Sequence, residues 1–370
     1  MRSSSSSSSH AFSCSLKCSF LHILCSSIYN LLLNSATVNG FTVSENGFSP
    51  LMELPVPTNG LYSNTSIRWS RTVVLNIDDF GAKGDGFSDD TKPCTQAPTA
   101  VTFHRCKNLK VRNLTLFNGQ QLHMAFTHCT HVAASHVTFV APADSPNTDG
   151  IDISASTRVE LKDIIITTGD DCISIVSNSS RIRVKNVVCG PGNGISIGSL
   201  GKYNSSASVQ DVTVSGGALF DSKNGVRIKT WQGGSGFARN ITFENIWMKN
   251  VSNPIVIDQY YCDSPETCGN QTSAVSIDSI YFCNIKGTSA TEEAIRFACS
   301  DSYPCKRLYL ENIQLTASSG IAAKSFCWKA YGTSTGPVYP PSCISSGEII
   351  IRYRVKSNST GWRRDDYAVF

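Results

Sequence analysis

The stretch GPGNGISIGS, residues 190–199, places a polar tip before a short run in which apolar and polar residues alternate. The same outline occurs in NTDGIDIS, residues 147–154, and in GDDCISIV, residues 169–176. Alternation of β-branched residues is typical of strands, and the Gly, Asn and Asp residues before each run are typical of turns. Related runs follow as GVRIK, PIVID and AIRFA, so the chain repeats one turn-and-strand unit along its length.

A second pattern recurs between residues 105 and 318: a small polar residue, an aliphatic residue, any residue, and then usually an apolar one. Its first aliphatic residues are Leu114, Val137, Ile164, Val187, Val212, Ile241, Ile280 and Ile313, at intervals of 23 to 39 residues. Two or three short strands per repeat predict an all-β fold, a right-handed parallel β-helix whose strands pair with their equivalents one coil away. A β-sandwich is the alternative, but the constant order of two strands in each repeat favours the β-helix.

The register of the short strands predicts which side chains meet, because equivalent positions of successive coils stack in a β-helix. When the strands are aligned on Ile151, Ile173, Ile195 and Val226, the residues two positions earlier are Asp149, Asp171, Asn193 and Asn224. Asp149 and Asp171 are therefore expected on adjacent coils, whereas Asp170 is expected to point elsewhere, because successive strand residues alternate. The polar residues that open four repeats are expected to form a ladder at an inner turn; they are Asn113, Asn186, Asn240 and Asn312.

These carboxylates suggest a particular chemistry. Close carboxylates repel one another, which usually raises the pKa of one of them and leaves a neutral acid beside an ionised base. Hydrolysis of a glycosidic bond needs that combination. On the following coil, Arg227 and Lys229 add two cations, which suit an anionic sugar. Asp-Gly and Gly-Asp-Asp are also common turn sequences. Clustered aspartates suit calcium as well, but the two cations argue against a metal site.

The composition limits the classes of function. With 370 residues, 41% of them hydrophobic, the chain can bury a substantial core. A net charge of +4 without a basic block argues against nucleic-acid binding, and no apolar stretch is long enough to predict a membrane span. The 15 cysteines and eight Asn-x-Ser/Thr sequences suit an extracellular protein. We expect a Ser-rich leader with a signal peptide at 1–36, a linker at 37–72, the β-helix domain at 73–345 and a C-terminal tail at 346–370.

Four segments, in order, resemble the signature motifs of the plant polygalacturonases, glycoside hydrolase family 28. They are NTDG at 147–150, GDDC at 169–172, CGPGNGISIGSLG at 189–201 and RIK at 227–229. FGAKGDGFSDDTK, residues 80–92, resembles the start of the family's mature domain. The resemblance implies a right-handed parallel β-helix, secreted to the cell wall, that hydrolyses α-1,4-linked galacturonan of pectin with inversion. It implies no metal and no cofactor. The expected partner is polygalacturonate, with the protein as a monomer.

The resemblance also implies roles for individual residues. Asp170 is the proton donor, and Asp149 and Asp171 activate the water molecule. The implied substrate-binding residues are Asn147, Arg227, Lys229 and Tyr261, the last from the segment DQYYC. The family pairs the cysteines of the second and third motifs, here Cys172 and Cys189. Closeness in sequence makes Cys262–Cys268, Cys299–Cys305 and Cys327–Cys343 plausible further bridges.

Two departures from the family pattern bear on activity. Asn193 stands where the third motif normally has histidine, so a titratable side chain is missing from the expected catalytic group. His123 lies one coil before Asp149, and we interpret it as an ordinary turn residue. Only residues 93–97 separate DDTK from the next strand, where the family has on the order of three further turns. The N-terminal coils are therefore expected to be shortened, with strand edges exposed at that end. Two other functions remain open: a protein that binds oligogalacturonate without cleaving it, and a truncated product without function.

Overall fold

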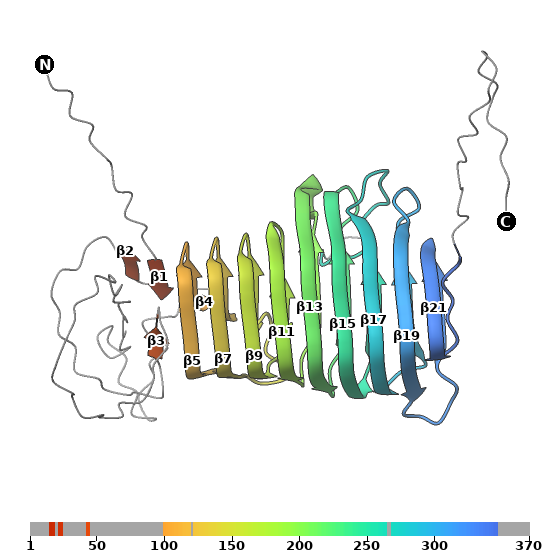
Figure 1. Ribbon diagram of the computed structural model, residues 1–370, viewed down its shortest axis with the longest axis horizontal. Coiled ribbons are helices and arrows are strands. Elements are labelled where there is room, and N and C mark those ends of the chain that lie inside the picture. Colours follow the sequence, from red (N-terminus) through yellow and green to blue (C-terminus); the bar gives the residue numbers. More distant parts are fainter. Residues whose placement is uncertain are drawn as a thin grey trace, which may run out of the picture.

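The computed structural model describes residues 99–119, 121–264 and 268–346, together with the backbone of the short strands β1 (Ser15–Cys18), β2 (Leu21–Leu24) and β3 (Thr42–Ser44). Strands β4 to β21 form two sheets, and Figure 1 shows the strands of one of them, from β5 to β21, in order along the molecule. Apart from these short strands and Ser346, the expected leader (1–36), linker (37–72) and tail (346–370) lie outside the described residues.

The first sheet carries the short strands of the repeat, and we call it the short sheet. From β4 onward it contains β4 (Thr99–His104), β6 (Leu122–Thr127), β8 (Ile151–Ser154), β10 (Ile173–Ile175), β12 (Ile195–Leu200), β14 (Asn224–Thr230), β16 (Asn253–Asp258), β18 (Glu293–Ala298) and β20 (Lys324–Trp328). A single turn of 3-10 helix, η3 (Lys202–Asn204), follows β12.

The second sheet contains the longer strands, and we call it the long sheet. From β5 onward it contains β5 (Lys107–Phe117), β7 (Thr130–Val140), β9 (Thr157–Thr167), β11 (Ser179–Cys189), β13 (Ser206–Phe220), β15 (Ser235–Val251), β17 (Ser276–Ser289), β19 (Cys305–Ala317) and β21 (Ala330–Tyr339). The chain alternates between the two sheets, so each coil contributes one strand to each.

Pairing between successive coils is parallel throughout β4 to β21. A β-sandwich is built from antiparallel sheets, so this pairing excludes the sandwich and confirms the prediction of a parallel β-helix. The register predicted for the short strands is also confirmed, because Ile151 pairs with Ile173, Ile173 with Ile195, and Ile195 with Val226.

The long strands bend at single residues in the left-handed backbone conformation. One column of such residues contains Asn108, His131, Arg158, Arg181, Asp211, Asn240, Ser279 and Arg307, and a second contains Asn113, His136, Asp163, Asn186, Asn245, Asn284 and Asn312. Asn and Asp tolerate this conformation better than most L-residues. The polar residue that opens each repeat is therefore a corner, and the aliphatic residue after it turns into the core.

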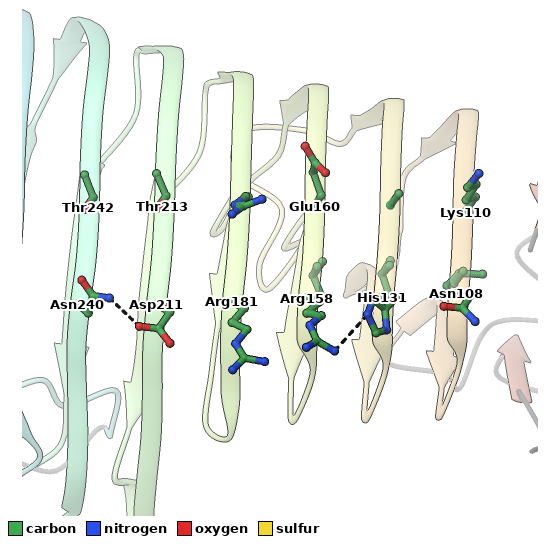
Figure 2. Close-up of a pocket in the computed structure, with 15 residues that line it drawn as sticks. Asn108, Lys110, His131, Arg158, Glu160, Arg181, Asp211, Thr213, Asn240 and Thr242 are labelled. Atoms are coloured by element: carbon green, nitrogen blue, oxygen red, sulfur yellow. Dashed lines mark hydrogen bonds between the residues drawn. The ribbon is translucent and has the colours of Figure 1, made fainter. Parts of the chain in front are cut away.

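The predicted asparagine ladder is partly wrong, because the repeated pattern marks two different corners. Asn240 belongs to the first column and donates to Asp211 at 2.6 Å (Figure 2). Asn113, Asn186 and Asn312 belong to the second column; Asn113 and Asn186 are exposed and Asn312 is half-buried, so none lies at an inner turn. The ladder is also mixed in composition: Asn186 donates to Asp163 at 3.0 Å.

The core is a set of stacked apolar side chains between the sheets. Phe243 stacks on Phe282 with ring centroids 5.5 Å apart, and Phe282 on Phe297 at 5.6 Å. The first contact joins equivalent positions of successive coils, which lie one strand spacing apart in the parallel register. The second joins the two sheets within one coil, since Phe282 lies on β17 and Phe297 on β18. The stacked core fixes the height of each coil, and with it the height of each turn on the outer face.

At the N-terminal end, the strand edges that we expected to be exposed carry antiparallel strands. β1 pairs with β4, and β3 pairs with β5. The expectation of unpaired edges is therefore wrong for β4 and β5.

Four disulfides lie within the described residues, and they are the four pairs considered from the sequence: Cys172–Cys189, Cys262–Cys268, Cys299–Cys305 and Cys327–Cys343. Cys129 and Cys283 are free thiols. No helix among the described residues is long and apolar enough to cross a membrane.

Candidate active site

Three carboxylates meet on the outer face of the short sheet, in the turns that precede β8 and β10. Asp149, Asp170 and Asp171 place carboxylate oxygens within 4.8 Å of one another. The expectation that Asp170 points elsewhere is wrong. Alternation of side chains applies to extended strands, whereas β10 begins only at Ile173, so Asp170 and Asp171 both lie in a turn.

Close backbone contacts fix the turns that carry these aspartates. A Cβ atom on Gly169 would lie 2.0 Å from the carbonyl oxygen of Ser145, so only glycine fits there. The N–H of Gly169 donates to Oγ1 of Thr148 at 2.9 Å. The bond between Cys172 and Cys189 ties the end of the same turn to the following coil. The carboxylates therefore stand on backbone that has little room to move.

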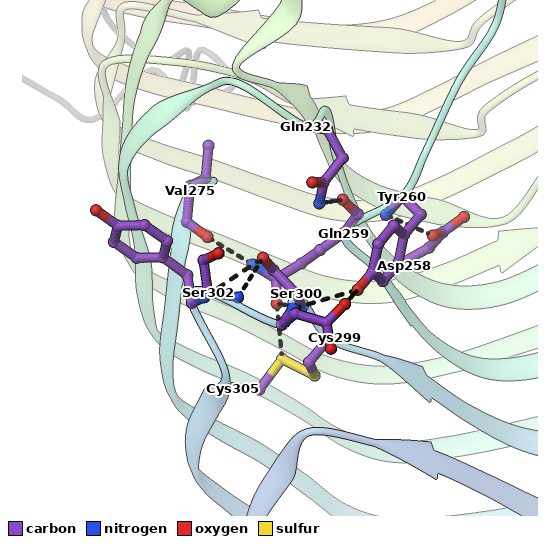
Figure 3. Close-up of a disulfide and its surroundings, with 11 residues drawn as sticks. Gln232, Asp258, Gln259, Tyr260, Val275, Cys299, Ser300, Ser302 and Cys305 are labelled. Atoms are coloured by element: carbon purple, nitrogen blue, oxygen red, sulfur yellow. Dashed lines mark hydrogen bonds between the residues drawn. A yellow bond between two sulfur atoms is a disulfide. The ribbon is translucent and has the colours of Figure 1, made fainter. Parts of the chain in front are cut away.

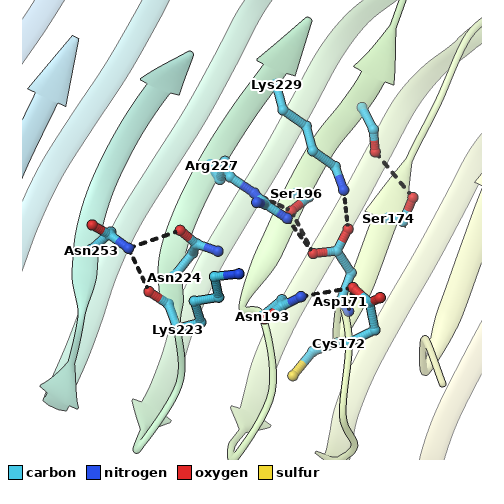
Figure 4. A network of polar contacts seen from close by, with 12 residues as sticks. Asp171, Cys172, Ser174, Asn193, Ser196, Lys223, Asn224, Arg227, Lys229 and Asn253 are labelled. Atoms are coloured by element: carbon cyan, nitrogen blue, oxygen red, sulfur yellow. Dashed lines mark hydrogen bonds and ion pairs between the residues drawn. The ribbon is translucent and has the colours of Figure 1, made fainter. Parts of the chain in front are cut away.

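Asp171 is the most enclosed of the three, with 1% of its surface exposed. Its carboxylate accepts from Nη2 of Arg227 and Nζ of Lys229, both at 2.7 Å, and from Oγ of Ser196 at 2.9 Å (Figure 4). All three partners project from the next two strands, β12 and β14. Asp171, Arg227 and Lys229 thus form a buried ionic group, which places both predicted sugar-binding cations next to a carboxylate predicted to activate the water molecule.

Asp170 is held by two donors at one of its oxygens. Oδ1 accepts from the N–H of Asp171 and from Nδ2 of Asn193, both at 2.8 Å. Asn193 also donates its backbone N–H to the carbonyl of Asp170 at 2.8 Å. Asn193 therefore lies in the site, as the register predicted, and it supplies a hydrogen-bond donor although it lacks the titratable ring of histidine.

The surroundings of Asp149 change its acidity. Burial, followed by the negative charges of Asp171, Asp152 and Asp170, raises the pKa of Asp149 to about 8. At pH 5–7 its carboxyl group therefore keeps a proton. The pKa shift agrees with the sequence argument that crowded carboxylates leave one neutral acid, and it identifies that acid in the resting state as Asp149.

Asp152 is a fourth carboxylate that the sequence argument missed. It lies on β8 in register with Ser174, Ser196 and Arg227. Its Oδ1 atom is buried without a hydrogen-bond partner, and burial raises the pKa of Asp152 to about 6. The register that located Asp149 would also have located Asp152, had the polar face of the strands been read as well as the turns.

His123 supports the backbone of Asp149. It is fully buried on β6, so its interpretation as an ordinary turn residue is wrong. Its Nε2 accepts the N–H of Gly119 at 3.1 Å, which leaves the proton on Nδ1 to donate to the carbonyl of Asp149 at 3.0 Å. Burial lowers the pKa of His123, so the ring stays neutral and keeps this pair of bonds.

The predicted substrate-binding residues are only partly brought together. The ring of Tyr261 lies 5.2 Å from Nζ of Lys229 and 5.9 Å from the guanidinium carbon of Arg227. Trp231 meets the Tyr261 ring edge-on at 5.9 Å, an aromatic neighbour that the sequence did not single out. Asn147 is exposed and makes no hydrogen bond to a described residue, so its place in the cleft stays a prediction.

A buried amide network supports the segment that carries Tyr261 (Figure 3). Gln259 is fully buried. Its side chain donates to the carbonyl of Val275 at 2.8 Å and accepts the N–H of Ser300 at 2.9 Å. Its own carbonyl accepts from Nε2 of Gln232 at 2.8 Å. Since a buried polar group left without partners is costly, these bonds hold the segment in one position two residues before the aromatic ring.

The three aspartates do not suit a metal ion. A calcium ion would need several of their oxygens as ligands. Both oxygens of Asp171 already accept from cations, Nη2 of Arg227 and Nζ of Lys229. These two positive charges neutralise the carboxylate of Asp171 in place of a metal ion, so we assign no metal-binding function to the cluster.

Comparison with known proteins identifies the family. The model for "Glycosyl hydrolases family 28" matches residues 71–333. The chain belongs to glycosyl hydrolase family 28. Among its curated relatives, a probable polygalacturonase of Arabidopsis thaliana is 54% identical over 271 residues, which cover 73% of this chain and 61% of the relative. Polygalacturonase-2 of Solanum lycopersicum is 51% identical over 253 residues, covering 68% and 55%. The chain thus spans between one half and two thirds of these family 28 proteins.

Solved structures share the fold of this family 28 chain. The endo-xylogalacturonan hydrolase of Aspergillus tubingensis is 24% identical, with a TM-score of 0.52, and the match covers 65% of this chain and 68% of that one. The hyperthermoactive exopolygalacturonase of Thermotoga maritima is 21% identical, with a TM-score of 0.50, covering 59% and 51%. Both likenesses concern the fold alone.

The raised pKa of Asp149 predicts a pH-dependent stability for this family 28 chain. Between pH 4 and 8 the folded state retains a proton that the unfolded state has released, so the free energy of unfolding falls as the pH rises. In Asp149→Asn this contribution is absent. We expect wild type to lose about 2 kcal/mol more than the variant between pH 5 and 7, measured as urea midpoints at constant m-value. Asp144→Asn, at an exposed position of the same loop, is the control. Parallel pH curves for wild type and Asp149→Asn would contradict the assignment of the proton to Asp149.

Proposed function

We propose that this chain is a hydrolase that cleaves α-1,4-linked galacturonan of pectin. The observation that carries the proposal is the cluster of Asp149, Asp170 and Asp171 within 4.8 Å, beside Arg227 and Lys229. Membership of family 28 and the identity of about 50% to plant polygalacturonases support it. No metal or cofactor takes part in the proposed reaction.

The proposed mechanism needs one proton to move within the cluster. Because the pKa of Asp149 is raised, that proton lies on Asp149 before the reaction. Oδ1 of Asp170 is engaged, but its second oxygen accepts no hydrogen bond from a described residue and is free to receive a proton. Transfer from Asp149 to Asp170 leaves Asp170 neutral, as the donor to the glycosidic oxygen. It leaves Asp149 ionised, so that Asp149 and Asp171 together take a proton from the attacking water.

The spacing of the carboxylates bears on stereochemistry. Inverting glycosidases commonly separate acid and base by about 6.5–9.5 Å, with the water between them. Here the oxygens lie within 4.8 Å, so we propose that the water binds beside Asp149 and Asp171, on the face of the sugar away from the leaving group. Inversion in such a site depends on where the substrate lies, which makes the anomer of the product the decisive measurement.

Binding of the substrate's carboxylate falls to the cations of β14. Arg227 and Lys229 retain 11% and 10% side-chain exposure, and each has donors beyond the one given to Asp171. We propose that they bind a galacturonate carboxylate with those remaining donors, while the ring of Tyr261 packs against the sugar. The same two residues then contact both the substrate and the carboxylate of Asp171, so that binding also orients the sugar relative to Asp171.

The test is release of reducing ends from polygalacturonate by the purified, disulfide-bonded chain, with the first product followed by NMR. Inversion at an α-linkage yields the β-anomer first. Initial α-anomer would reject the inverting mechanism. Salt-sensitive binding of polygalacturonate without release of reducing ends would instead favour the binding protein, and absence of a cooperative unfolding transition would favour the non-functional product.

We also propose that the protein is monomeric and secreted to the cell wall. Six of its Asn-x-Ser/Thr acceptors lie in the described residues and all six are exposed: Asn113, Asn178, Asn204, Asn240, Asn250 and Asn270. The four disulfides suit an oxidising compartment.

Restoring histidine at position 193 is expected to raise turnover at least about tenfold, equivalent to roughly 1.4 kcal/mol of activation free energy. Asn193 already donates to Asp170, so the gain must come from the positive charge and titration of the imidazole. The free energy of unfolding should change by about 1 kcal/mol or less, because the position is only half-buried. Asn193→Ala, which lacks the donor, should turn over more slowly than wild type. A folded Asn193→His variant with unchanged turnover would mean that the asparagine is not what limits the rate.

A further inference from the structure

A second concave surface lies on the long sheet, away from the carboxylates. It is a groove of about 680 Å³ that crosses the outer face of β5, β7, β9, β11, β13 and β15 (Figure 2). The groove follows the first column of corner residues, where every long strand changes direction at the same height. Because the bend repeats on each coil, the hollow is linear and runs along the axis of the β-helix.

The lining of this groove is basic. Lys110, Arg158, Arg181 and Arg183 contribute four cations, from β5, β9 and β11. Two acids also line the groove: Glu160 pairs with Nζ of Lys185 at 3.3 Å, and Asp211, on β13, lies beyond the strands that carry the cations. The cations therefore dominate the local potential over the half of the groove nearest the N-terminal coils. We call this half the basic groove.

The cations of the basic groove lack the acidic partners that some other surface cations have. On the same molecule, Lys202 pairs with Asp263, Lys324 with Glu292, and Arg296 with Glu293. Lys110, Arg181 and Arg183 form no ion pair with any residue in the described part of the chain.

Arg158 also forms no ion pair with a described residue. Its Nη1 contacts only the ring nitrogen of His131, at 3.2 Å. The guanidinium groups of Arg158, Arg181 and Arg183 thus present donors to solvent, in a geometry that suits carboxylates.

We propose that the basic groove binds an anionic polysaccharide, a run of uronate residues lying along the β-helix axis, independently of the catalytic cleft. A linear ligand with regularly spaced carboxylates suits a linear groove in which Arg158 and Arg181 lie at equivalent positions of adjacent coils, about 4.8 Å apart, and Lys110 lies two coils before Arg158. That the polysaccharide is galacturonan rests on the proposed function. Two binding sites on one molecule raise the effective concentration of a long chain at the cleft without adding any contact there.

Binding is tested without turnover by affinity electrophoresis of the full chain in gels containing polygalacturonate. Every variant carries Asp170→Asn, so the probe stays intact. The groove variant is Arg181→Gln/Arg183→Gln. The matched control is Lys249→Gln/Lys286→Gln, which removes two exposed, unpaired cations of the same sheet, on β15 and β17. Gels containing neutral dextran correct for the change in electrophoretic mobility that the charge substitutions cause. Thermal melts check that each variant is folded.

We expect the groove variant to bind polygalacturonate about threefold to tenfold more weakly than the parent, with the difference shrinking as salt rises, and the control to bind as the parent does. In the active background, the KM for polymer should rise by the same factor while kcat and KM for short oligogalacturonides stay unchanged. Equal retardation of the folded groove variant and the control would overturn the proposal. Because retardation needs no cleavage, that result is independent of whether the chain is a hydrolase.

Discussion

Asp170→Asn is expected to lower the release of reducing ends from polygalacturonate by about 10³-fold, the usual contribution of a well-placed general acid. Asparagine has the shape of aspartate, and its carbonyl oxygen can still accept from the N–H of Asp171 and from Asn193, as Oδ1 of Asp170 does. What the variant loses is the acidic proton on the other oxygen. The measurement is kcat/KM on polygalacturonate, at constant ionic strength.

The control for this variant distinguishes the loss of a general acid from the loss of a general base. A galacturonide with a strongly acidic aryl leaving group departs without protonation, so Asp170→Asn should retain most of its activity on that substrate. Asp149→Asn should not, because a missing base slows attack by water whatever the leaving group. The opposite pattern, with Asp149→Asn rescued by the activated substrate, would make Asp149 the proton donor. The raised pKa of Asp149 gives that outcome a physical basis.

The fold could be predicted from sequence because its determinants are local and repeated. Each coil carries its own turn residues and its own alternating strand. The pairing of Ile151, Ile173 and Ile195 then follows from stacking equivalent positions. The repeat was harder to divide correctly, since two corners per coil share one pattern. The pattern aligns Val187 with Val212, but the neighbour of Val187 on the next coil is Gly217.

The site was predicted where it depends on register and was missed where it depends on contacts. Register located Asp149, Asp171 and Asn193. It could not show that Asp170 turns toward them, because that depends on where the strand begins. Nor could it show that buried His123 donates to the carbonyl of Asp149, since that bond joins a strand to the turn of the next coil. Side-chain contacts between coils carry no signature in a single sequence.

Lys229→Met is expected to lower the free energy of unfolding by about 3–5 kcal/mol, the usual cost of removing one partner from a buried ion pair. The carboxylate of Asp171 has 1% exposure and cannot regain water when Nζ of Lys229 is removed. Arg227 alone then faces Asp171 and its neighbour Asp149. Methionine approximates the length of the lysine stem, so the loss reflects the missing charge and not a cavity. Urea denaturation at pH 7 with a fixed m-value measures the effect.

The double variant Asp171→Asn/Lys229→Met decides whether the unpaired charge is the cause. Removing the carboxylate's charge along with its partner should recover most of the lost stability, because a neutral amide needs only the hydrogen bonds that Ser196 and Arg227 still donate. Additive losses in the two single variants and the double variant would contradict this account. They would mean that the cost of Lys229→Met does not come from an unpaired carboxylate at Asp171, and that this ion pair, which spans β12 between β10 and β14, contributes little to stability.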